Sequence, residues 1–104
     1  MSKKKKQIRE NFRNEVFSRD KGKCLKCGDK AVDAHHITDR NEMPNGGYVK
    51  ENGISVCDEC HVKAEVWHIS GKTESVDGYH PNDLYLLIES NYDLAVAKSK
   101  ELGG

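Results

Sequence analysis

Four cysteines form two Cys-x-x-Cys pairs in this chain, Cys24 with Cys27 and Cys57 with Cys60. The two-residue spacing lets both sulfurs of a pair reach one metal ion, and two such pairs complete a tetrahedral site of four thiolates. A closed tetrahedron leaves no position open for a substrate, so we expect a structural zinc ion here. The alternative is four free, buried thiols.

Two adjacent histidines lie between the cysteine pairs, within residues 31–37, which read as a strand. Neighbouring residues of a strand point to opposite faces. His35 and His36 therefore cannot play the same role, and one metal ligand beside one general base fits this arrangement. Asp33 or a backbone carbonyl could orient an imidazole ring by accepting a hydrogen bond from it.

A third histidine, His61, directly follows Cys60 at the start of a helix predicted over residues 58–69. Glu65 lies one turn later on the same helix face, so the two side chains can bind one ion together. His68, a further turn along, is a weaker candidate. Asn52, just before a short strand predicted over residues 53–56, could brace the preceding loop by hydrogen bonds or reach the metal itself.

The N-terminal half of the chain contains the other elements that must position these side chains. Ile8, Phe12 and Val16 recur every four positions, which predicts an amphipathic helix over residues 7–19 after a frayed lysine run. Residues 38–51 are predicted as a long loop, and a loop of this length in a small domain is usually functional.

Apolar periodicity also predicts which helix faces are buried in the C-terminal half. The helix over 58–69 should bury a stripe formed by Val62, Val66 and Ile69. Residues 70–80 form a polar linker, and Pro81 suits the first turn of a helix. Apolar residues then continue at helical spacing, with a break at residues 90–91: Leu84, Leu87 and Ile88, followed by Leu94, Val96 and Ala97.

Composition limits the class of protein. A chain of 104 residues that is 36% hydrophobic and 33% charged is one domain with a modest core, which calls for a staple such as zinc. No signal peptide follows the lysine-rich start, and no stretch is long enough to cross a membrane. We therefore expect a cytoplasmic protein without membrane contact, where cysteines bind metal rather than form disulfides.

The formal net charge of zero conceals an asymmetry along the chain. Residues 1–30 hold eleven Lys and Arg against four Asp and Glu, a balance of +7, and residues 31–104 carry the opposite balance. A basic segment on a neutral protein indicates contact with a polyanion, although a solubilising tail is the alternative. The basic side chains expected to contact phosphates are Lys5, Arg9, Arg13 and Arg19, with Arg40 as a phosphate clamp or an ordinary surface arginine.

The set of motifs resembles the HNH endonucleases, the His-Me finger nucleases with a ββα-metal core. The resemblance covers residues 12–68 and is carried by the Cys-x-x-Cys pairs, Asp-Ala-His-His-Ile, Asn-Gly-Ile and Cys-His. It implies an α+β fold in one domain. Residues 1–22 would be a basic helix, residues 23–69 the zinc knuckle and ββα core, and residues 70–104 a helical extension.

The resemblance also implies a role for each motif residue. His36 would be the general base, and His35 and His61 ligands of a catalytic divalent cation. Asn52 would hold the loop so that His36 stays in place, or in some members bind the metal. Glu65 stands where some members have another ligand histidine, and a carboxylate there would favour Mg²⁺ or Mn²⁺.

These observations predict a metal-dependent endonuclease that hydrolyses double-stranded DNA by histidine activation of water. No sequence-reading module is visible, so specificity is low or comes from a partner protein, and a double-strand break would need a dimer or two visits. Small chains of this kind are common in phages and mobile elements, which suggests a bacterial or phage-infected cell. The rival is a non-catalytic zinc-ribbon module that binds nucleic acid or protein; a redox dithiol protein fits less well.

Overall fold

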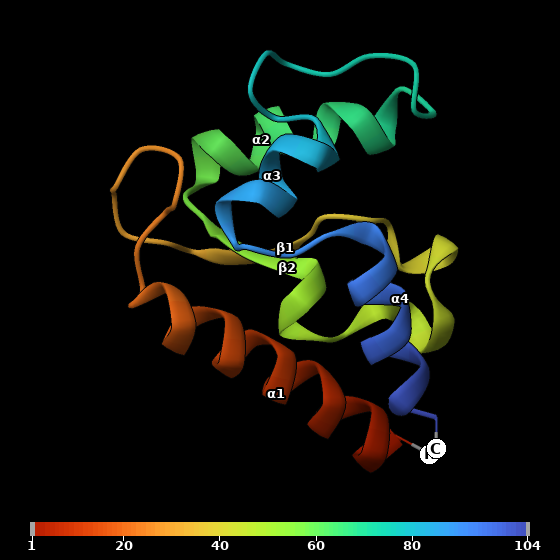
Figure 1. Ribbon diagram of the computed structural model, residues 1–104. Helices are drawn as coiled ribbons and strands as arrows, with labels where there is room; N and C mark the ends of the chain where they lie inside the picture. Colours follow the sequence, from red (N-terminus) through yellow and green to blue (C-terminus); the bar gives the residue numbers. More distant parts are fainter. Residues whose placement is uncertain (1, 104) are drawn as a thin grey trace.

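The computed structural model describes residues 2–103, and the side chains of residues 4–103. Met1 and Gly104, the ends of the expected domain, lie outside the described residues. Within residues 2–103 the chain forms four α-helices, three short 3₁₀ helices and a two-stranded antiparallel sheet (Figure 1). This is the expected α+β class, compatible with a ββα-metal core.

Helix α1 (Ser2–Asp20) begins before the expected start, because the lysine run is helical rather than frayed. Its apolar face is the predicted one: Phe12 and Val16 are buried, and Ile8 is half-buried. This face packs closely on the sheet at Gly53, where an added Cβ would lie only 2.6 Å from atoms of Phe12 and Val16. A glycine at this position therefore sets how near the helix can approach.

The sheet pairs β1 (Asp33–His36) with β2 (Gly53–Val56), with His35 opposite Ile54 and His36 opposite Gly53. The second strand has the expected bounds, and the first is shorter than the expected 31–37. Helix α1 lies on one side of the sheet and α2 (Asp58–Ile69) on the other (Figure 1). Each of the two histidines of β1 therefore faces a different helix.

The connection between the strands is more regular than a loop. It contains the short 3₁₀ helices η1 (Arg40–Glu42), η2 (Pro44–Gly47) and η3 (Lys50–Asn52). Gly47, at the end of η2, has a φ of +66°, and an added Cβ would lie 2.7 Å from the side-chain nitrogen Nδ2 of Asn52. The connection is thus folded tightly around that side chain.

The prediction of which face of α2 is buried is wrong, although the helix has the predicted bounds. Val62 is 69% exposed and Ile69 is 80% exposed, while Val66 is half-buried. Cys60 and Ala64 are the buried residues of this helix. The face toward the sheet carries cysteine and histidine side chains, so Val62 and Ile69 face solvent.

The linker 70–80 leads to α3 (Pro81–Leu87) and, after the expected break, α4 (Tyr92–Glu101). Asn91 caps α4 by accepting a hydrogen bond from the Leu94 amide. Leu84 is buried as expected, but Leu87 and Leu94 are exposed, and Ala95 and Ser99 are the buried residues of α4. Small residues on this face let α4 pack closely over η2 and η3.

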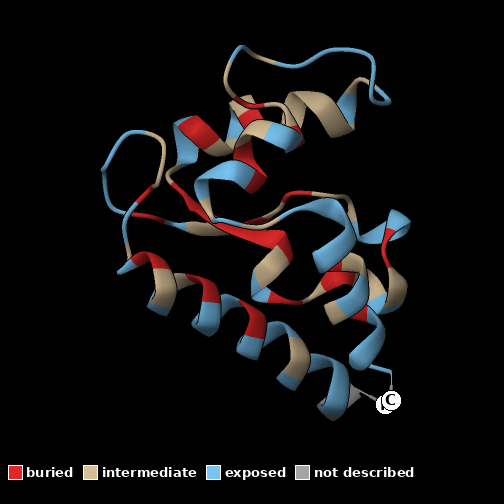
Figure 2. Ribbon diagram, in the orientation of Figure 1, coloured by how far each residue is buried: buried red, intermediate tan, exposed pale blue. Residues whose placement is uncertain are grey.

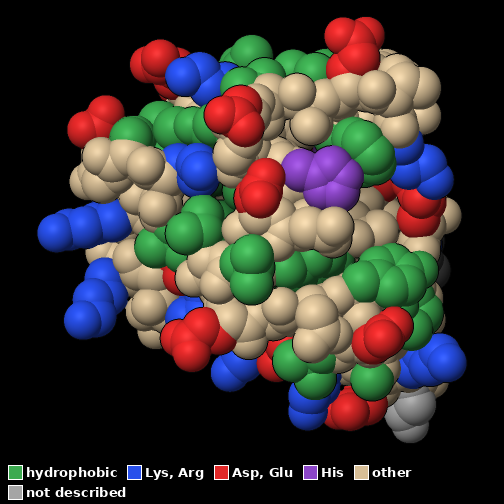
Figure 3. All heavy atoms as spheres, turned by 45° about the horizontal axis from the view of Figure 1, so that its top comes forward, with side chains coloured by type: hydrophobic (Ala, Val, Ile, Leu, Met, Phe, Trp, Pro, Cys, Tyr) green, Lys and Arg blue, Asp and Glu red, His purple; other side chains and the backbone are tan. Residues whose placement is uncertain are grey.

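Buried residues concentrate along the sheet and on the helix faces that cover it (Figure 2). On the face shown in Figure 3, hydrophobic side chains lie in several separate patches among charged ones. No helix within residues 2–103 is long and apolar enough to span a bilayer. Because the buried residues lie along the sheet and the helices that cover it, these elements form the frame that positions the histidines.

Candidate metal and nucleic-acid site

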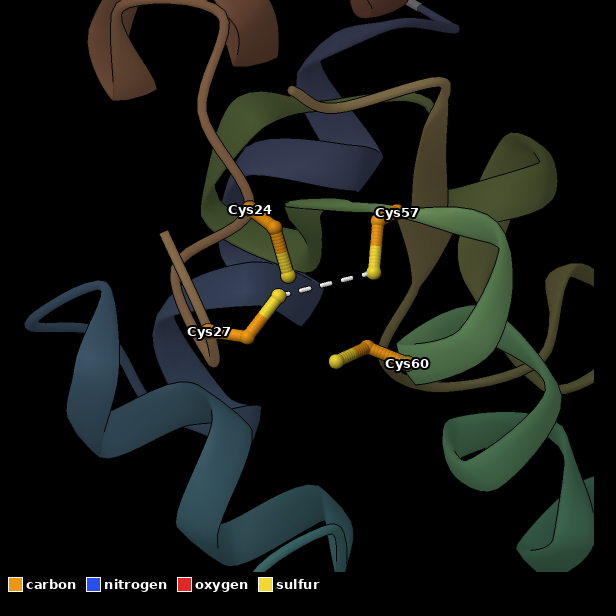
Figure 4. Close-up of side chains that lie close together, drawn as sticks. All are labelled: Cys24, Cys27, Cys57 and Cys60. Carbon is orange, nitrogen blue, oxygen red and sulfur yellow. Dashed lines mark hydrogen bonds between the residues drawn. The ribbon is translucent and has the colours of Figure 1, made fainter. Parts of the chain in front are cut away.

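The four cysteines converge from two parts of the chain, the turn after α1 and the junction of β2 with α2 (Figure 4). Their sulfur atoms all lie within 4.8 Å of one another, and the Sγ atoms of Cys27 and Cys57 are 3.6 Å apart. Sulfurs around a tetrahedral zinc with bonds near 2.3 Å lie about 3.8 Å apart. Because all four cysteines are free thiols, the cluster fits a metal site such as zinc.

The linker 70–80 packs against the cysteine cluster. The hydroxyl of Tyr79 donates a hydrogen bond to Cys60 Sγ at 3.2 Å. The ammonium of Lys26 lies 4.6 Å from the centre of the Tyr79 ring and donates to the Gly78 carbonyl at 2.9 Å. A donor and a nearby cation both stabilise negative charge on thiolate sulfur, so this linker supports metal binding as well as covering the core.

On the α2 side of the sheet, His35 lies against two side chains of that helix. Ligand atoms of His35, Glu65 and His68 all lie within 4.8 Å of one another. His35 is 2% exposed, and its Nδ1 is 3.0 Å from a Glu65 oxygen without hydrogen-bond geometry, so neither ring nitrogen has a hydrogen-bond partner among the described residues. Buried nitrogens without partners are costly, and a cation between these side chains would bind the unprotonated one.

Electrostatics at this group favour the charge states that bind metal. Burial lowers the pKa of His35, which keeps its imidazole neutral. The close approach of His35 lowers the pKa of the Glu65 carboxyl to about 2, so this side chain is a carboxylate at neutral pH. Metal ligands of these two types must be deprotonated, and both are.

His61 lies at the open edge of the same group. Its Nε2 is 3.4 Å from the Glu65 carboxylate and its Nδ1 is 3.2 Å from Asp33 Oδ2. A carboxylate that accepts from one ring nitrogen leaves the other free to bind metal. Asp33 thus orients an imidazole, as the sequence suggested, and it orients His61.

His36 points to the opposite side of the sheet, toward α1. Its ring stacks on Phe12, with centroids 4.6 Å apart, and meets the edge of Tyr48 at 4.7 Å. Burial lowers its pKa to about 4, so the imidazole is neutral at pH 7 and one of its ring nitrogens is unprotonated. A pocket of about 300 Å³ is nevertheless lined by both His36 and the α2 group, together with Arg40.

Asn52 is completely buried, and its side chain is fully used in hydrogen bonds. Its oxygen accepts from the Thr38 amide at 3.0 Å and from the Tyr85 hydroxyl at 2.7 Å, and its nitrogen donates to the carbonyls of Thr38 and Gly47. Both lone pairs of the amide oxygen are therefore occupied. Of the two roles considered for Asn52, bracing the loop matches this geometry and binding a metal does not.

A second pocket, of about 740 Å³, adjoins the first at Arg40 and Tyr48. The sequence candidates Lys5 and Arg9 line it together with Lys4, and its described lining contains no acidic side chain. Lys4, Lys5, Arg9 and Arg40 are called the basic groove below.

The other two arginines of α1 bond to other parts of the chain. Arg13 donates to the Val32 carbonyl at 3.1 Å and lies over the Phe17 ring. Arg19 binds both carboxylate oxygens of Asp20 and donates to the Lys50 and Gly53 carbonyls. Arg19 therefore fixes the end of α1 to β2 rather than facing a ligand.

Sequence reasoning overlooked two tyrosines, Tyr48 and Tyr85. Tyr48 contacts His36, and its hydroxyl raises the pKa of the Arg40 guanidinium beside it. Tyr85, from α3, reaches Asn52 across 33 residues of chain. Neither lies in a recognisable motif, so periodicity and spacing contain no signal for them.

The small α+β fold is compatible with a ββα-metal core, and its cysteine cluster fits a metal site such as zinc. Residues 24–66 match the family model of the HNH endonucleases. No curated protein and no solved structure matches this chain. The resemblance inferred from the motifs is therefore confirmed by this match, and α1 and the C-terminal helices lie outside the matched segment.

Proposed function

We propose that this protein is a metal-dependent endonuclease that hydrolyses phosphodiester bonds of double-stranded DNA. The observation that carries the proposal is the pocket shared by His36 and the α2 group, because it puts a neutral imidazole beside a set of metal ligands. The family match supports a nuclease, and the adjoining basic groove supports a polyanionic substrate.

The candidate general base is His36. A neutral imidazole takes the proton of the attacking water, and general-base catalysis of this kind typically contributes about 10²–10⁴-fold. Stacking between Phe12 and Tyr48 fixes the plane of the ring, and Asn52 fixes the loop that follows it. These contacts together fix the orientation of the His36 side chain.

His35, His61 and Glu65 are the candidate ligands of the catalytic cation. A divalent cation held there would supply neutralisation of the negative charge that develops on the phosphate in the reaction. Arg40 lines both pockets, which supports a role for its guanidinium in holding a neighbouring phosphate so that the strand stays in line with His36. Contacts of this kind are to the backbone, which carries no sequence information.

The test is nicking of supercoiled plasmid by zinc-loaded protein. Nicking that requires added Mg²⁺, Mn²⁺ or Ni²⁺ is the expected result, and omission of the cation is a better control than chelation because it leaves the structural zinc in place. Binding of the plasmid without nicking under every cation would contradict the proposal and support the non-catalytic zinc-ribbon alternative. A linear product at low protein concentration would show whether dimers act on both strands.

A further inference from the structure

Three side chains of α2 share the face that looks toward His35. His61, Glu65 and His68 are spaced at i, i+4 and i+7, and these positions lie within one stripe of a helix. The HNH resemblance uses the first two positions only. The third, His68, is half-buried, and its ring centroid is 5.3 Å from that of His35.

Hydrogen bonding at His68 fixes which of its nitrogens is free. Nε2 lies 3.0 Å from the carbonyl oxygen of His36, and because a carbonyl only accepts, Nε2 carries the proton. Nδ1 is consequently the unprotonated nitrogen. It is buried and has no partner among the described residues, and His68 belongs to the group whose ligand atoms lie within 4.8 Å of one another with His35 and Glu65.

This is the arrangement in which a backbone carbonyl holds a ligand histidine in its metal-binding tautomer. The carbonyl belongs to His36, so the same contact connects the candidate base with the candidate metal site. A merely structural histidine would leave Nδ1 buried without a hydrogen-bond partner, which is unfavourable. A cation bound at Nδ1 removes that cost.

We propose that His68 is a direct ligand of the catalytic cation through Nδ1. Together with His35, His61 and Glu65 it makes a donor set of three imidazoles and one carboxylate. Imidazole suits Zn²⁺, Ni²⁺ and Cu²⁺, whereas Mg²⁺ is bound mainly by oxygen. The site therefore selects an imidazole-preferring cation, in contrast to the Mg²⁺ or Mn²⁺ that Glu65 alone would favour. The inference rests on the proposed function only in placing the catalytic cation in this pocket.

Calorimetric titration of zinc-loaded protein with Ni²⁺ and with Mg²⁺ tests the inference without an activity assay. The informative variant is His68→Gln, since its amide N–H can still donate to the His36 carbonyl. We expect it to weaken Ni²⁺ binding by about 100-fold, because loss of even an outer partner of a ligand typically costs 10–100-fold. Mg²⁺ binding should be weaker than Ni²⁺ binding in the parent and almost unaffected by the substitution.

The matched control is His80→Gln. His80 caps α3 and packs against Trp67, away from the group, so this variant should keep the Ni²⁺ affinity of the parent. Unchanged Ni²⁺ affinity in His68→Gln, or tighter binding of Mg²⁺ than of Ni²⁺ by the parent, would overturn the inference.

A direct measurement on the unmutated protein covers the case in which His68→Gln does not fold. With a second equivalent of diamagnetic Zn²⁺, long-range ¹H–¹⁵N spectra should show a shift of His68 Nδ1 while Nε2 stays protonated; an unshifted Nδ1 refutes the inference. Plasmid nicking separates the two proposals. If the parent binds Ni²⁺ through His68 and never nicks DNA, the metal site stands and the nuclease function fails.

Discussion

His35 and His36 show how a single peptide step along a strand separates two chemical roles. His35 faces α2, buried among carboxylate and imidazole side chains, and His36 faces α1, between Phe12 and Tyr48. Burial lowers the pKa of both rings, so each is neutral at pH 7 and can donate a lone pair, one to a metal and the other to a proton. The alternation of the strand, rather than any difference in residue type, makes this division.

His36→Ala should abolish nicking and leave the metal affinity of the protein intact. The substitution removes the proposed base and none of the proposed ligands, so we expect a loss of about 10²–10⁴-fold in cleavage rate, the usual range for general-base catalysis. His35→Ala is the matched comparison, since it should instead weaken cation binding and recover partly in excess cation. Plasmid nicking beside calorimetric metal titration distinguishes them. If His36→Ala loses the metal and His35→Ala cuts normally, the two roles are exchanged.

At the scale of elements, the sequence located the helices and strands better than it located their buried faces. The bounds of β2 and α2 could be predicted because Gly53 and the Cys-x-x-Cys-His motif mark their starts. The buried face of α2 could not, because apolar periodicity assumes that apolar residues point inward. Here the inward positions belong to Cys60 and to the candidate ligands, and tertiary packing exposes Val62 and Ile69.

The residues of the candidate site also fall into those that the sequence predicted and those that it could not predict. Ligand types and spacing predicted the cysteine cluster and placed His61 and Glu65 on one helix face, and the structure brings them together. Tyr85 belongs to an element that the motif does not include, and its contact with Asn52 depends on how α3 folds back over the loop. Long-range contacts of this kind follow from the packing of the whole chain and cannot be read from one segment.

Tyr85→Phe tests whether α3 supports the loop that carries the site. The Tyr85 hydroxyl donates to Asn52 and lies 2.6 Å from Thr38 Oγ1, and burial raises its pKa to about 12, so it is a neutral donor under all working conditions. Removing the hydroxyl leaves the side chains of Asn52 and Thr38 with one hydrogen bond fewer each. We expect a loss of about 1–3 kcal/mol in the free energy of unfolding.

The matched control for that change is Tyr92→Phe, because Tyr92 is half-exposed at the start of α4. Urea unfolding of zinc-loaded protein gives both values. Equal stabilities for the two variants would mean that the Tyr85 hydroxyl contributes nothing to the loop and that α3 is only a cover.

At the scale of the whole molecule, the cysteine cluster joins parts that the small core alone would hold weakly. It connects the turn after α1, the end of β2, the start of α2 and, through Tyr79, the linker 70–80. Structural zinc sites contribute on the order of 10–16 kcal/mol in small peptides, which is comparable with the 5–15 kcal/mol that stabilises a whole domain. The fold should therefore depend on its metal.

Cys27→Ser should unfold the protein or leave it unable to melt cooperatively. Cys27 is exposed, so the change removes a metal ligand without creating a cavity in the core, and any large effect comes from the lost metal. Circular dichroism melting with zinc analysis checks this, with the exposed Ser18→Ala as the control substitution. A soluble, zinc-free Cys27→Ser protein that melts cooperatively would show that four thiols suffice without metal.

The basic groove makes a prediction about where the charge of the molecule acts. Residues 1–30 carry a balance of +7, yet Lys5 and Arg9 line the groove while Lys21 and Lys30 are exposed elsewhere. If DNA follows the groove to Arg40, Lys5→Glu with Arg9→Glu should weaken plasmid binding far more than Lys21→Glu with Lys30→Glu, although both pairs change the net charge equally. Each lost phosphate contact should also reduce the slope of log affinity against log salt by about 0.9.

Fluorescence anisotropy with a labelled duplex, measured across a salt series, gives both quantities. The groove pair is expected to lower the slope by about 2, because two phosphate contacts are lost, while the control pair leaves it near the parent value. Zinc content and melting temperature should match the parent in both variants, since none of the four side chains belongs to the cysteine cluster. Equal losses in the two pairs would mean that charge acts through the general field of the N-terminal segment, and the groove would not be the path of the DNA.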